Sequence, residues 1–577
     1  MKKIFACLMA LTLVFSSALC FAEGENVPAK IDMTKWQYEA EDDVYWQVGL
    51  SYAATPADSS YETMGIFVPG AYFTGTDNGD GTYTCTVNET GAAGQYTATT
   101  APMIIPVNTP GYSAMAAPTG YSSSMGYGSI SDYTNEGIIV LFTGARGRDA
   151  GAPAGVADFK AAIRYVRYNK DLLPGDTDSI FSLGMSGGGA QSALIGASGN
   201  SELYTPYLEA IGAVMTESDT VKGSMCWCPI TNLDIADEAY EWNMGNTRSG
   251  LSDEEQAYSD GMALAFAEYI NGLGLTDENG TALTLAESEE GIYQNGSYYK
   301  YVKDVIETSL EHFLSDTEFP YTASSSGRFG GGRGGMGGMR GMGDLAGGKP
   351  DSDNVPIEAL DGIQRNTDTA TDTSEAKTYA TAEEYIAELN GDEPWITYDA
   401  ATNTATISSI EAFVKACKSA SKSVGAFDDL NAAQGENTLF GYGDGKGAHF
   451  DAIMAKLLEN TEYADAYNTD IARVDALGNG VGYRIDMYTP MYYIDDMYDG
   501  YKSADVAPFF RIRTGINQGD TALSTEINLA LGLKAYGSDV DFEMVWGQGH
   551  TKAERGVQDE SAADTNFISW VNSCMAK

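Results

Sequence analysis

Residues 184–188, Gly-Met-Ser-Gly-Gly, constrain the fold of this chain more than any other segment. They follow an apolar run at 179–183 that predicts a buried strand, and they lead into a predicted helix over 189–197. A serine flanked by glycines between a strand and a helix is typical of a strained turn. Such a turn lifts the hydroxyl above a sheet and directs the next backbone N–H at a reacting oxygen. The pattern predicts Ser186 as a nucleophile and the Gly187 N–H as an oxyanion donor; the alternative is a glycine-rich turn without chemistry.

Strands and helices alternate around this turn. An apolar run at 138–142 predicts a strand covered on both faces, and helical spacing follows over 155–168, with a further strand at 221–227. The alternation stops near Asn232 and resumes near Ala507. Beyond it, strands are predicted at 508–513 and 540–546, and helices at 525–536 and 561–575. This order predicts an α/β fold with a mostly parallel sheet flanked by helices.

A long insertion separates the two halves of the predicted sheet. Residues 232–506, called the lid segment below, have a mainly helical pattern and are expected to cover the carboxyl edge of the sheet. Within it, residues 326–349 consist almost entirely of Gly, Met and Arg, a composition that predicts a flexible segment. The core would then comprise residues 23–231 and 507–577. Turn residues flanked by a β-favouring run also predict a hairpin at 76–84.

The first 22 residues are typical of a secretory signal peptide. Two lysines precede an apolar run at 4–15 that is too short to span a bilayer, and small residues before Ala22 offer a cleavage site. A lipoprotein anchor at Cys20 is disfavoured because Leu19 stands where such signals have a small residue. No later stretch reaches the roughly 20 apolar residues of a membrane helix. We expect an exported, soluble protein.

Composition argues against several classes of partner. The chain has 81 acidic and 34 basic side chains and a net charge of −47, which disfavours nucleic acid and anionic membranes. An odd, sparse set of cysteines remains after cleavage and predicts neither a disulfide framework nor a metal site. These cysteines are Cys85, Cys226, Cys228, Cys417 and Cys574. We expect no cofactor, and the oligomeric state stays open.

A serine nucleophile needs a base, and histidine has a suitable pKa. The chain contains three histidines, His312, His449 and His550. Only His550 directly follows the last predicted core strand, where this kind of sheet carries its base, so it is the predicted base. The preceding loop, 514–521, has Asp520 as its only carboxylate, and Asp520 is the predicted triad acid with Glu526 as second choice.

A second oxyanion donor is expected from a loop that follows another strand of the sheet. The loop after the 138–142 strand covers residues 144–149. The backbone N–H of Ala145 or Arg146 is therefore the predicted second donor.

Four segments resemble the bacterial tannase family. They are Gly-Ala-Arg-Gly-Arg-Asp at 144–149, Asp-Phe-Lys-Ala-Ala-Ile-Arg-Tyr at 158–165, Gly-Ala-Ser-Gly-Asn at 196–200 and Cys-Pro-Ile-Thr-Asn-Leu-Asp at 228–234. The resemblance extends from about Trp36 to the carboxyl terminus, without the Gly/Met/Arg segment. It implies an α/β-hydrolase fold with a large, mainly helical lid insertion. It also implies hydrolysis of galloyl and related phenolic esters, with feruloyl-type esterases among the relatives.

The resemblance also identifies substrate-binding candidates and one departure. The resemblance implies Asp-Arg-Asp in the acid loop, as in tannases, where the first Asp is the triad acid and the second contacts substrate hydroxyls. This chain has Gln-Gly-Asp there, so Gln518 replaces the first Asp; either Asp520 takes over or the triad is incomplete. Lys422 and Glu436 look like the lysine and glutamate that bind galloyl hydroxyls in tannases. The alternative for these two is an exposed lid charge and a helix-capping carboxylate.

Together these features predict an exported serine esterase that acts on a small-molecule ester of a phenolic acid. One rival is a non-catalytic surface or carbohydrate-binding protein on a hydrolase scaffold, which the altered acid loop and the long insert suggest. The other is a peptidase on the same scaffold, disfavoured because the chain lacks the propeller-type companion domain.

Overall fold

A computed structural model of the 577-residue chain describes residues 26–122, 126–288, 292–323, 377–418, 420–556 and 561–577. The predicted signal peptide and the Gly/Met/Arg segment lie outside the described residues. In the part of the chain that is described, no helix has both the length and the apolar character needed to cross a membrane.

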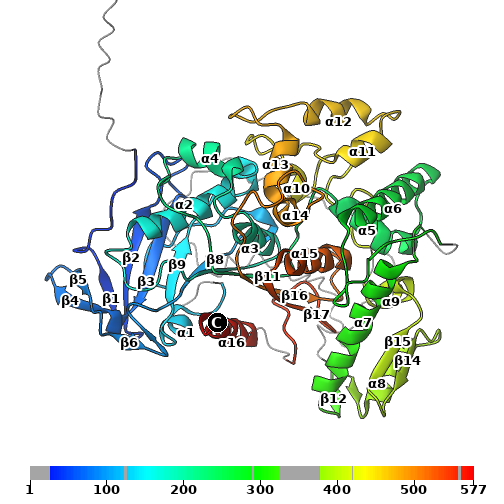
Figure 1. Cartoon of the computed structure of the whole chain (residues 1–577), viewed down its shortest axis with the longest axis horizontal. Coiled ribbons are helices and arrows are strands. Elements are labelled where there is room, and N and C mark those ends of the chain that lie inside the picture. The colour runs from blue at the N-terminus through cyan, green and yellow to red at the C-terminus, as the bar shows by residue number, and fades with distance from the viewer. Residues whose placement is uncertain (1–25, 123–125, 289–291, 324–376, 419, 557–560) are drawn as a thin grey trace, which may run out of the picture.

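A nine-stranded sheet lies at the centre of the molecule, in the order β1-β2-β3-β9-β8-β10-β11-β16-β17 (Figure 1). The six strands from β9 to β17 in this order are parallel, whereas β1, β2 and β3 are antiparallel to their neighbours. The strands are β1 (Gln37–Glu39), β2 (Val44–Ser51), β3 (Thr63–Pro69), β8 (Met103–Val107), β9 (Ile139–Thr143), β10 (Ile180–Met185), β11 (Gly223–Trp227), β16 (Phe509–Gly515) and β17 (Asp539–Val545). The predicted mostly parallel sheet is confirmed.

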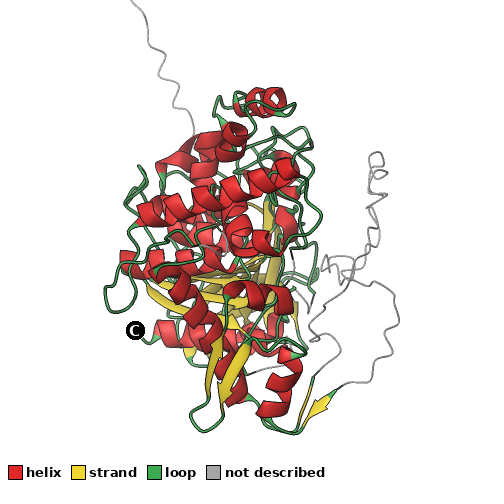
Figure 2. Ribbon diagram, turned by 90° about the vertical axis from the view of Figure 1, so that its right-hand side faces the viewer, coloured by secondary structure: helices red, strands yellow, loops and turns green. Residues whose placement is uncertain are grey.

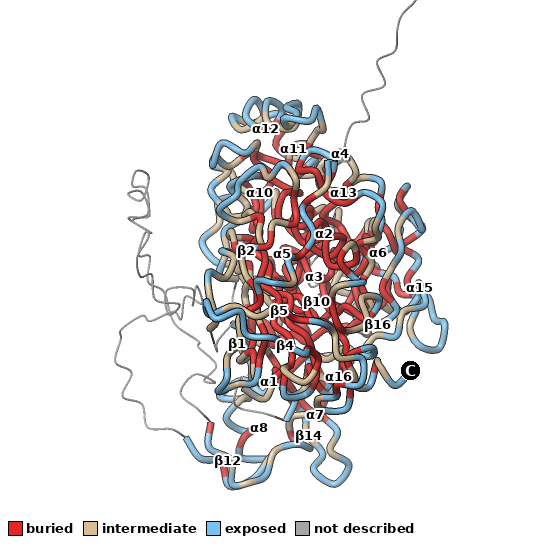
Figure 3. Tube along the Cα trace, turned by 90° about the vertical axis from the view of Figure 1, so that its left-hand side faces the viewer, coloured by how far each residue is buried: buried red, intermediate tan, exposed pale blue. Residues whose placement is uncertain are grey.

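Helices cover both faces of this sheet (Figures 1 and 2). Helices α2 (Ala154–Tyr168), α3 (Gly187–Ala197) and α15 (Leu523–Tyr536) lie on one face, and α1 (Ile130–Thr134) and α16 (Ser561–Met575) lie on the other. The central strands and α3 are buried along their length (Figure 3). Burial on both faces explains the continuous apolar runs that predicted these strands.

The predicted elements fall within a few residues of the observed ones. The predicted hairpin is formed by β4 (Phe73–Asp77) and β5 (Tyr83–Val87), which pair in antiparallel register. The predicted helix before Gly537 is α15, which ends at this glycine in a left-handed conformation with φ of 112°. Strands β1, β2, β3 and β8 of the sheet were not singled out from the sequence. Strand β8 contains Pro106, a residue that lacks a backbone donor and is unusual inside a sheet.

The lid segment connects the adjacent strands β11 and β16 and is mainly helical, as predicted (Figure 1). Its helices are α5 (Ala236–Met244), α6 (Asp253–Leu273), α7 (Ser297–Asp316), α8 (Ala382–Asn390), α9 (Ile410–Cys417), α10 (Gly435–Leu439), α11 (Ala452–Leu457), α12 (Ala464–Ile471), α13 (Val481–Tyr488) and α14 (Pro490–Ile494). It also holds two small ribbons, β12 (Tyr321–Thr322) with β13 (Thr378–Tyr379) and β14 (Ile396–Asp399) with β15 (Thr404–Ile407).

Parts of the lid segment pack onto the core itself. Helix α7 lies along the edge strand β17, where the Ser309 hydroxyl donates a hydrogen bond of 2.7 Å to the Met544 carbonyl. Helices α13 and α14 contact α3, the helix that follows Ser186. The insertion therefore shields one edge of the sheet and also reaches the helix next to the predicted nucleophile.

Candidate active site

Ser186 lies in a strained turn between β10 and α3. Its φ is 61° and its ψ is −126°, a backbone conformation that residues other than glycine rarely adopt. The turn is held because the Ser186 N–H donates to the Trp227 carbonyl at 2.9 Å. Gly188 is required beside it, since a Cβ at this position would lie 2.1 Å from the Val107 carbonyl oxygen of β8. The geometry of this segment is that of the predicted serine turn, closely packed between β8 and β11.

The loop after β8 lies against this turn. Gly187 begins α3, so its N–H has no partner within the helix. A Cβ on Gly187 would lie 2.5 Å from the Tyr112 nitrogen and 3.2 Å from the Gly111 nitrogen. The Tyr112 N–H donates to the Thr109 carbonyl at 2.9 Å, which makes Gly111 the better second donor of this loop.

Both predicted second oxyanion donors have other hydrogen-bond partners. The Ala145 N–H donates to the Met115 carbonyl at 2.8 Å, and the Arg146 N–H donates to the Asp158 carboxylate at 2.8 Å. The cause is the position of β8, which lies between β9 and β10. The loop after β8 therefore meets the serine turn, whereas the loop after β9 is one strand further away.

Three loops converge next to Ser186 at the carboxyl ends of the parallel strands. Cys228 directly follows Trp227, the hydrogen-bond acceptor of the Ser186 N–H. Its thiol donates to the Thr551 carbonyl at 3.2 Å, immediately after His550. The Asn517 N–H of the acid loop donates to the Gln548 carbonyl at 3.0 Å. These contacts bring the loop of His550 and the acid loop together at the edge of the sheet that carries Ser186.

The imidazole of His550 is bonded to Gln518 and not to Asp520. The Nδ1 atom of His550 lies 2.6 Å from the Gln518 amide oxygen, whereas its distance to the Asp520 carboxylate is 3.7 Å. Asp520 is therefore an adjacent charge rather than the acceptor of the imidazole N–H, which corrects the prediction. Gln518 is bonded on its other side as well, because its amide nitrogen donates to Glu526 Oε1 at 2.9 Å.

Burial lowers the pKa of His550, and the charge of Lys422 lowers it further. The Asp520 carboxylate acts in the opposite direction. A histidine with a lowered pKa stays neutral near physiological pH, and a base must be neutral to accept the serine proton.

The two other histidines have structural partners. His312 Nδ1 lies 2.6 Å from the Glu543 carboxylate, so this side chain joins α7 to β17. His449 is buried, lies 2.7 Å from the Asp428 carboxylate and stacks on the Tyr467 ring at a centroid distance of 3.7 Å. These contacts leave His550 as the base candidate at the serine edge.

Lys422 is connected to the acid loop by the hydroxyl of Tyr240. Its backbone N–H donates to the Tyr240 hydroxyl at 3.2 Å, and this hydroxyl donates to the Gly519 carbonyl at 2.9 Å. The ammonium of Lys422 lies 3.8 Å from the centroid of the Phe427 ring. Its charge acts on His550, so the structure brings this predicted residue to the base.

Glu436 lies on the opposite side, next to the loop after β8. It is buried in α10, where a Cβ on the preceding Gly435 would be 2.7 Å from Arg148 Nη1. Arg148 Nη1 donates to the Gly111 carbonyl at 2.9 Å. Glu436 also adds to the rise in the pKa of Tyr112 that burial causes. Lys422 thus lies near the base, and Glu436 lies near the loop after β8.

Sequence reasoning missed two residues at this site, Gly111 and Lys418. Gly111 could have been found from the Pro-Gly-Tyr turn directly after the apolar run at 103–107. Lys418 follows α9 and is buried, and its ammonium lies 3.3 Å from the Ile516 carbonyl. No local sequence signal marks it, because its partner loop lies about a hundred residues further along the chain.

The five cysteines that follow the predicted signal peptide form no disulfides, and all five are buried. Among the described residues, no group of three or more His, Cys, Asp or Glu side chains is arranged to hold a metal ion.

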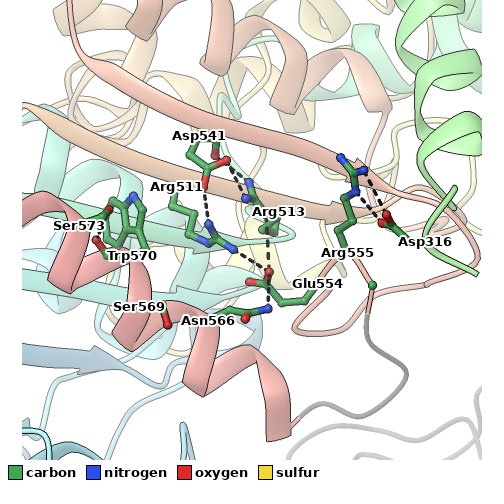
Figure 4. Close-up of a pocket in the computed structure, with 11 residues that line it drawn as sticks. Asp316, Arg511, Arg513, Asp541, Glu554, Arg555, Asn566, Ser569, Trp570 and Ser573 are labelled. Atoms are coloured by element: carbon green, nitrogen blue, oxygen red, sulfur yellow. Dashed lines mark hydrogen bonds and ion pairs between the residues drawn. The ribbon is translucent and has the colours of Figure 1, made fainter.

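A cavity of about 740 Å³ lies elsewhere, between α16 and the strands β16 and β17 (Figure 4). Its charged side chains pair with one another: Arg513 bonds Asp541 at 2.7 Å, and Arg511 bonds Glu554 at 2.7 Å. None of the predicted site residues lines this cavity. Its charges are balanced internally, so we do not assign it to the candidate active site.

Comparisons with known proteins agree with this fold. A family profile described as BD-FAE matches residues 96–262. Similar solved structures include tannin acyl hydrolase from Lactobacillus plantarum, with 26% identity, a TM-score of 0.64, and 92% of this chain and 94% of that chain covered. The tannase of Fusobacterium nucleatum is 25% identical, with a TM-score of 0.65, and 92% of this chain and 95% of that chain are covered. No curated protein sequence matches the chain.

Proposed function

Because this chain belongs to a tannase-like family of α/β-hydrolases and is a carboxylic ester hydrolase, we propose that it cleaves esters of phenolic acids. Ser186 is the nucleophile and His550 the base in this proposal. The observation that carries it is the strained Ser186 turn at the sheet edge where the His550 loop converges.

In the reaction, Ser186 Oγ attacks the ester carbonyl while its proton passes to His550 Nε2. The negative charge that develops on the carbonyl oxygen is stabilised by the N–H groups of Gly187 and Gly111. When the C–O bond of the alcohol breaks, the imidazolium returns the proton to the leaving oxygen and an acyl-Ser186 remains. Water, activated by His550, then releases the acid and regenerates the serine.

The third member of this triad is divided between two side chains. Gln518 accepts the Nδ1–H and so holds the imidazole in the tautomer whose Nε2 can accept a proton. Asp520 supplies the negative charge that stabilises the imidazolium from 3.7 Å. The predicted Ser-His-Asp triad thus becomes Ser186, His550 and Gln518, with Asp520 beside it.

The phenolic part of the substrate is proposed from the two lid residues. Similar solved structures include tannin acyl hydrolases in complex with ethyl gallate and with 3,4-dihydroxybenzoate. A ring with several hydroxyls needs hydrogen-bond partners when it is buried, and Lys422 and Glu436 offer one donor and one acceptor group. We assign these two residues to the ring hydroxyls.

The test uses the Ser186→Ala variant with p-nitrophenyl acetate and methyl gallate as substrates. Hydrolysis of both esters and labelling by a fluorophosphonate should be lost, because removal of a triad serine costs on the order of 10⁶ in turnover. A matched control is Ser182→Ala, a buried serine of β10 that bonds Ser192. Activity in Ser186→Ala would refute the assignment, and an inactive wild-type protein would favour a non-catalytic binding protein.

We also propose export from the cell, on the amino-terminal pattern alone. The exported product should begin at Glu23. Amino-terminal sequencing of protein from the culture medium or periplasm would identify this first residue. A product that retains residues 1–22 would contradict this proposal.

A further inference from the structure

Gln518 connects His550 to a second buried side chain. Its amide oxygen lies 2.6 Å from His550 Nδ1, and its amide nitrogen donates to Glu526 Oε1 at 2.9 Å. Gln518 is 3% exposed and Glu526 is fully buried at the start of α15. The imidazole, the amide and the carboxyl group therefore form one hydrogen-bonded chain, in which the amide and the carboxyl group are shielded from solvent.

The direction of this chain matters for catalysis. An amide has an acceptor on one side and a donor on the other, so its orientation determines which of the two faces His550. With the NH₂ group on Glu526, the oxygen faces Nδ1, and Nδ1 must carry the proton. Nε2 is then unprotonated and can accept the Ser186 proton. The opposite amide orientation would place NH₂ against Nδ1 and demand the wrong tautomer.

A carboxylate is the one side-chain group that can impose this orientation, because it accepts hydrogen bonds and donates none. Burial raises the pKa of Glu526 to about 8, and the charge of Lys418 opposes this rise. Lys418 is itself buried, at the end of α9 in the lid segment. Within the described residues, Glu526 Oε2 has no hydrogen-bond partner, so a proton on this oxygen would still leave Oε1 as the acceptor.

We propose, on the basis of the esterase function above, that Glu526 is a positioning residue that orients the Gln518 amide and thereby selects the reactive tautomer of His550. Lys418 is its counter-charge. In this arrangement an uncharged glutamine replaces the usual triad acid because a buried carboxylate behind it fixes its direction. The lid segment takes part in positioning the base, since Lys418 belongs to it.

The groups that act electrostatically near Glu526 come from several elements. Lys418 carries the opposing positive charge, and the carboxylate of Asp520 acts on the same ammonium. Two neutral groups are also close, the Cys228 thiol after β11 and the Tyr298 hydroxyl of α7; burial raises the pKa of both, and the charge of Glu526 raises it further. Glu526 and Lys418 are thus two buried groups behind the Gln518 amide whose charges act on each other.

The test measures the rate at which a fluorophosphonate labels Ser186, together with kcat and KM for p-nitrophenyl acetate. Glu526→Gln keeps the shape but allows the Gln518 amide both orientations. We expect labelling and kcat to fall about 10- to 100-fold with KM nearly unchanged, as when outer partners of a functional histidine are removed. The exchange variant Glu526→Gln/Gln518→Glu places the acceptor-only group directly against His550 and should restore the labelling rate to the wild-type value or above.

The control is Glu62→Gln, which neutralises another buried carboxyl group with a pKa raised by burial, to about 7. Glu62 precedes β3, and four strands separate β3 from β16, so its labelling rate should equal that of the wild type. Labelling of Glu526→Gln at the wild-type rate overturns the inference, and so does an exchange variant that is no faster than Glu526→Gln.

Folding is checked by the melting temperature of each variant. If Glu526→Gln does not fold, the exchange variant alone tests the orienting role. Labelling of the exchange variant that is slower than labelling of the wild type would contradict this role. Failure of the proposed function is recognised separately: the wild-type chain would then show neither labelling nor ester hydrolysis. A wild-type chain that is labelled normally, with Glu526→Gln equally fast, refutes only the role of Glu526.

Discussion

Asp520 is expected to contribute to catalysis only through its charge. Its carboxylate lies 3.7 Å from His550 Nδ1, and its side chain is 46% exposed. At this distance two unit charges interact by about 1 kcal/mol in water and about 4 kcal/mol at an effective dielectric constant of 20. Because the carboxylate is nearly half exposed, solvent screening favours the lower part of this range, roughly 1–2 kcal/mol. Asp520→Asn should therefore lower kcat/KM about 5- to 30-fold.

The assay is hydrolysis of p-nitrophenyl acetate by Asp520→Asn across the pH range. The carboxylate favours the imidazolium and so raises the pKa of His550. Without this charge the base loses its proton at a lower pH, and the acid limb of kcat/KM should move to lower pH. Asp539→Asn is the matched control, since this carboxylate is 50% exposed, pairs with Lys577 and lies at the opposite end of β17. Neither kcat/KM nor the acid limb should change in the control.

Two results would refute this reasoning. A loss near 10⁴ in Asp520→Asn is the cost of replacing a directly bonded triad acid by its amide, and would mean that Asp520 displaces Gln518 during the reaction. An unchanged kcat/KM with an unchanged acid limb would mean that the charge of Asp520 does not act on the imidazolium.

Three further outcomes are expected. Gln518→Leu removes the acceptor of the imidazole N–H and should lower kcat for p-nitrophenyl acetate about 100-fold or more; full activity would exclude Gln518 from the triad. Gly188→Ala places a Cβ 2.1 Å from a main-chain oxygen of β8 and should destabilise the fold by about 1–3 kcal/mol in calorimetry, whereas Gly482→Ala, in open space, should not. Lys422→Ala and Glu436→Ala should impair methyl gallate hydrolysis at least tenfold more than p-nitrophenyl acetate hydrolysis; equal losses would reduce both to scaffold residues.

The local features of this protein could be predicted from its sequence. Strands β10 and β17, helix α15 and the serine turn were predicted within a few residues, because apolar periodicity and glycine spacing act over short stretches of chain. The same reasoning selected Ser186 and His550 as candidates, since each lies in the turn or loop after a recognisable core strand. The mainly helical pattern of the lid segment could likewise be predicted, and the acidic composition follows directly from the sequence.

Tertiary structure alone decided the order of the strands and the partners of the base. Strand β8 enters the sheet between β9 and β10, so Gly111 rather than Ala145 or Arg146 meets the serine turn. Gln518 reaches His550 at 2.6 Å while Asp520 stops at 3.7 Å, a difference of turn geometry within one loop. Apolar patterns specify which face of each segment is buried, but not which segment becomes its neighbour. Hydrogen-bond partners from segments far apart in sequence follow from that packing, and packing is a property of the whole fold.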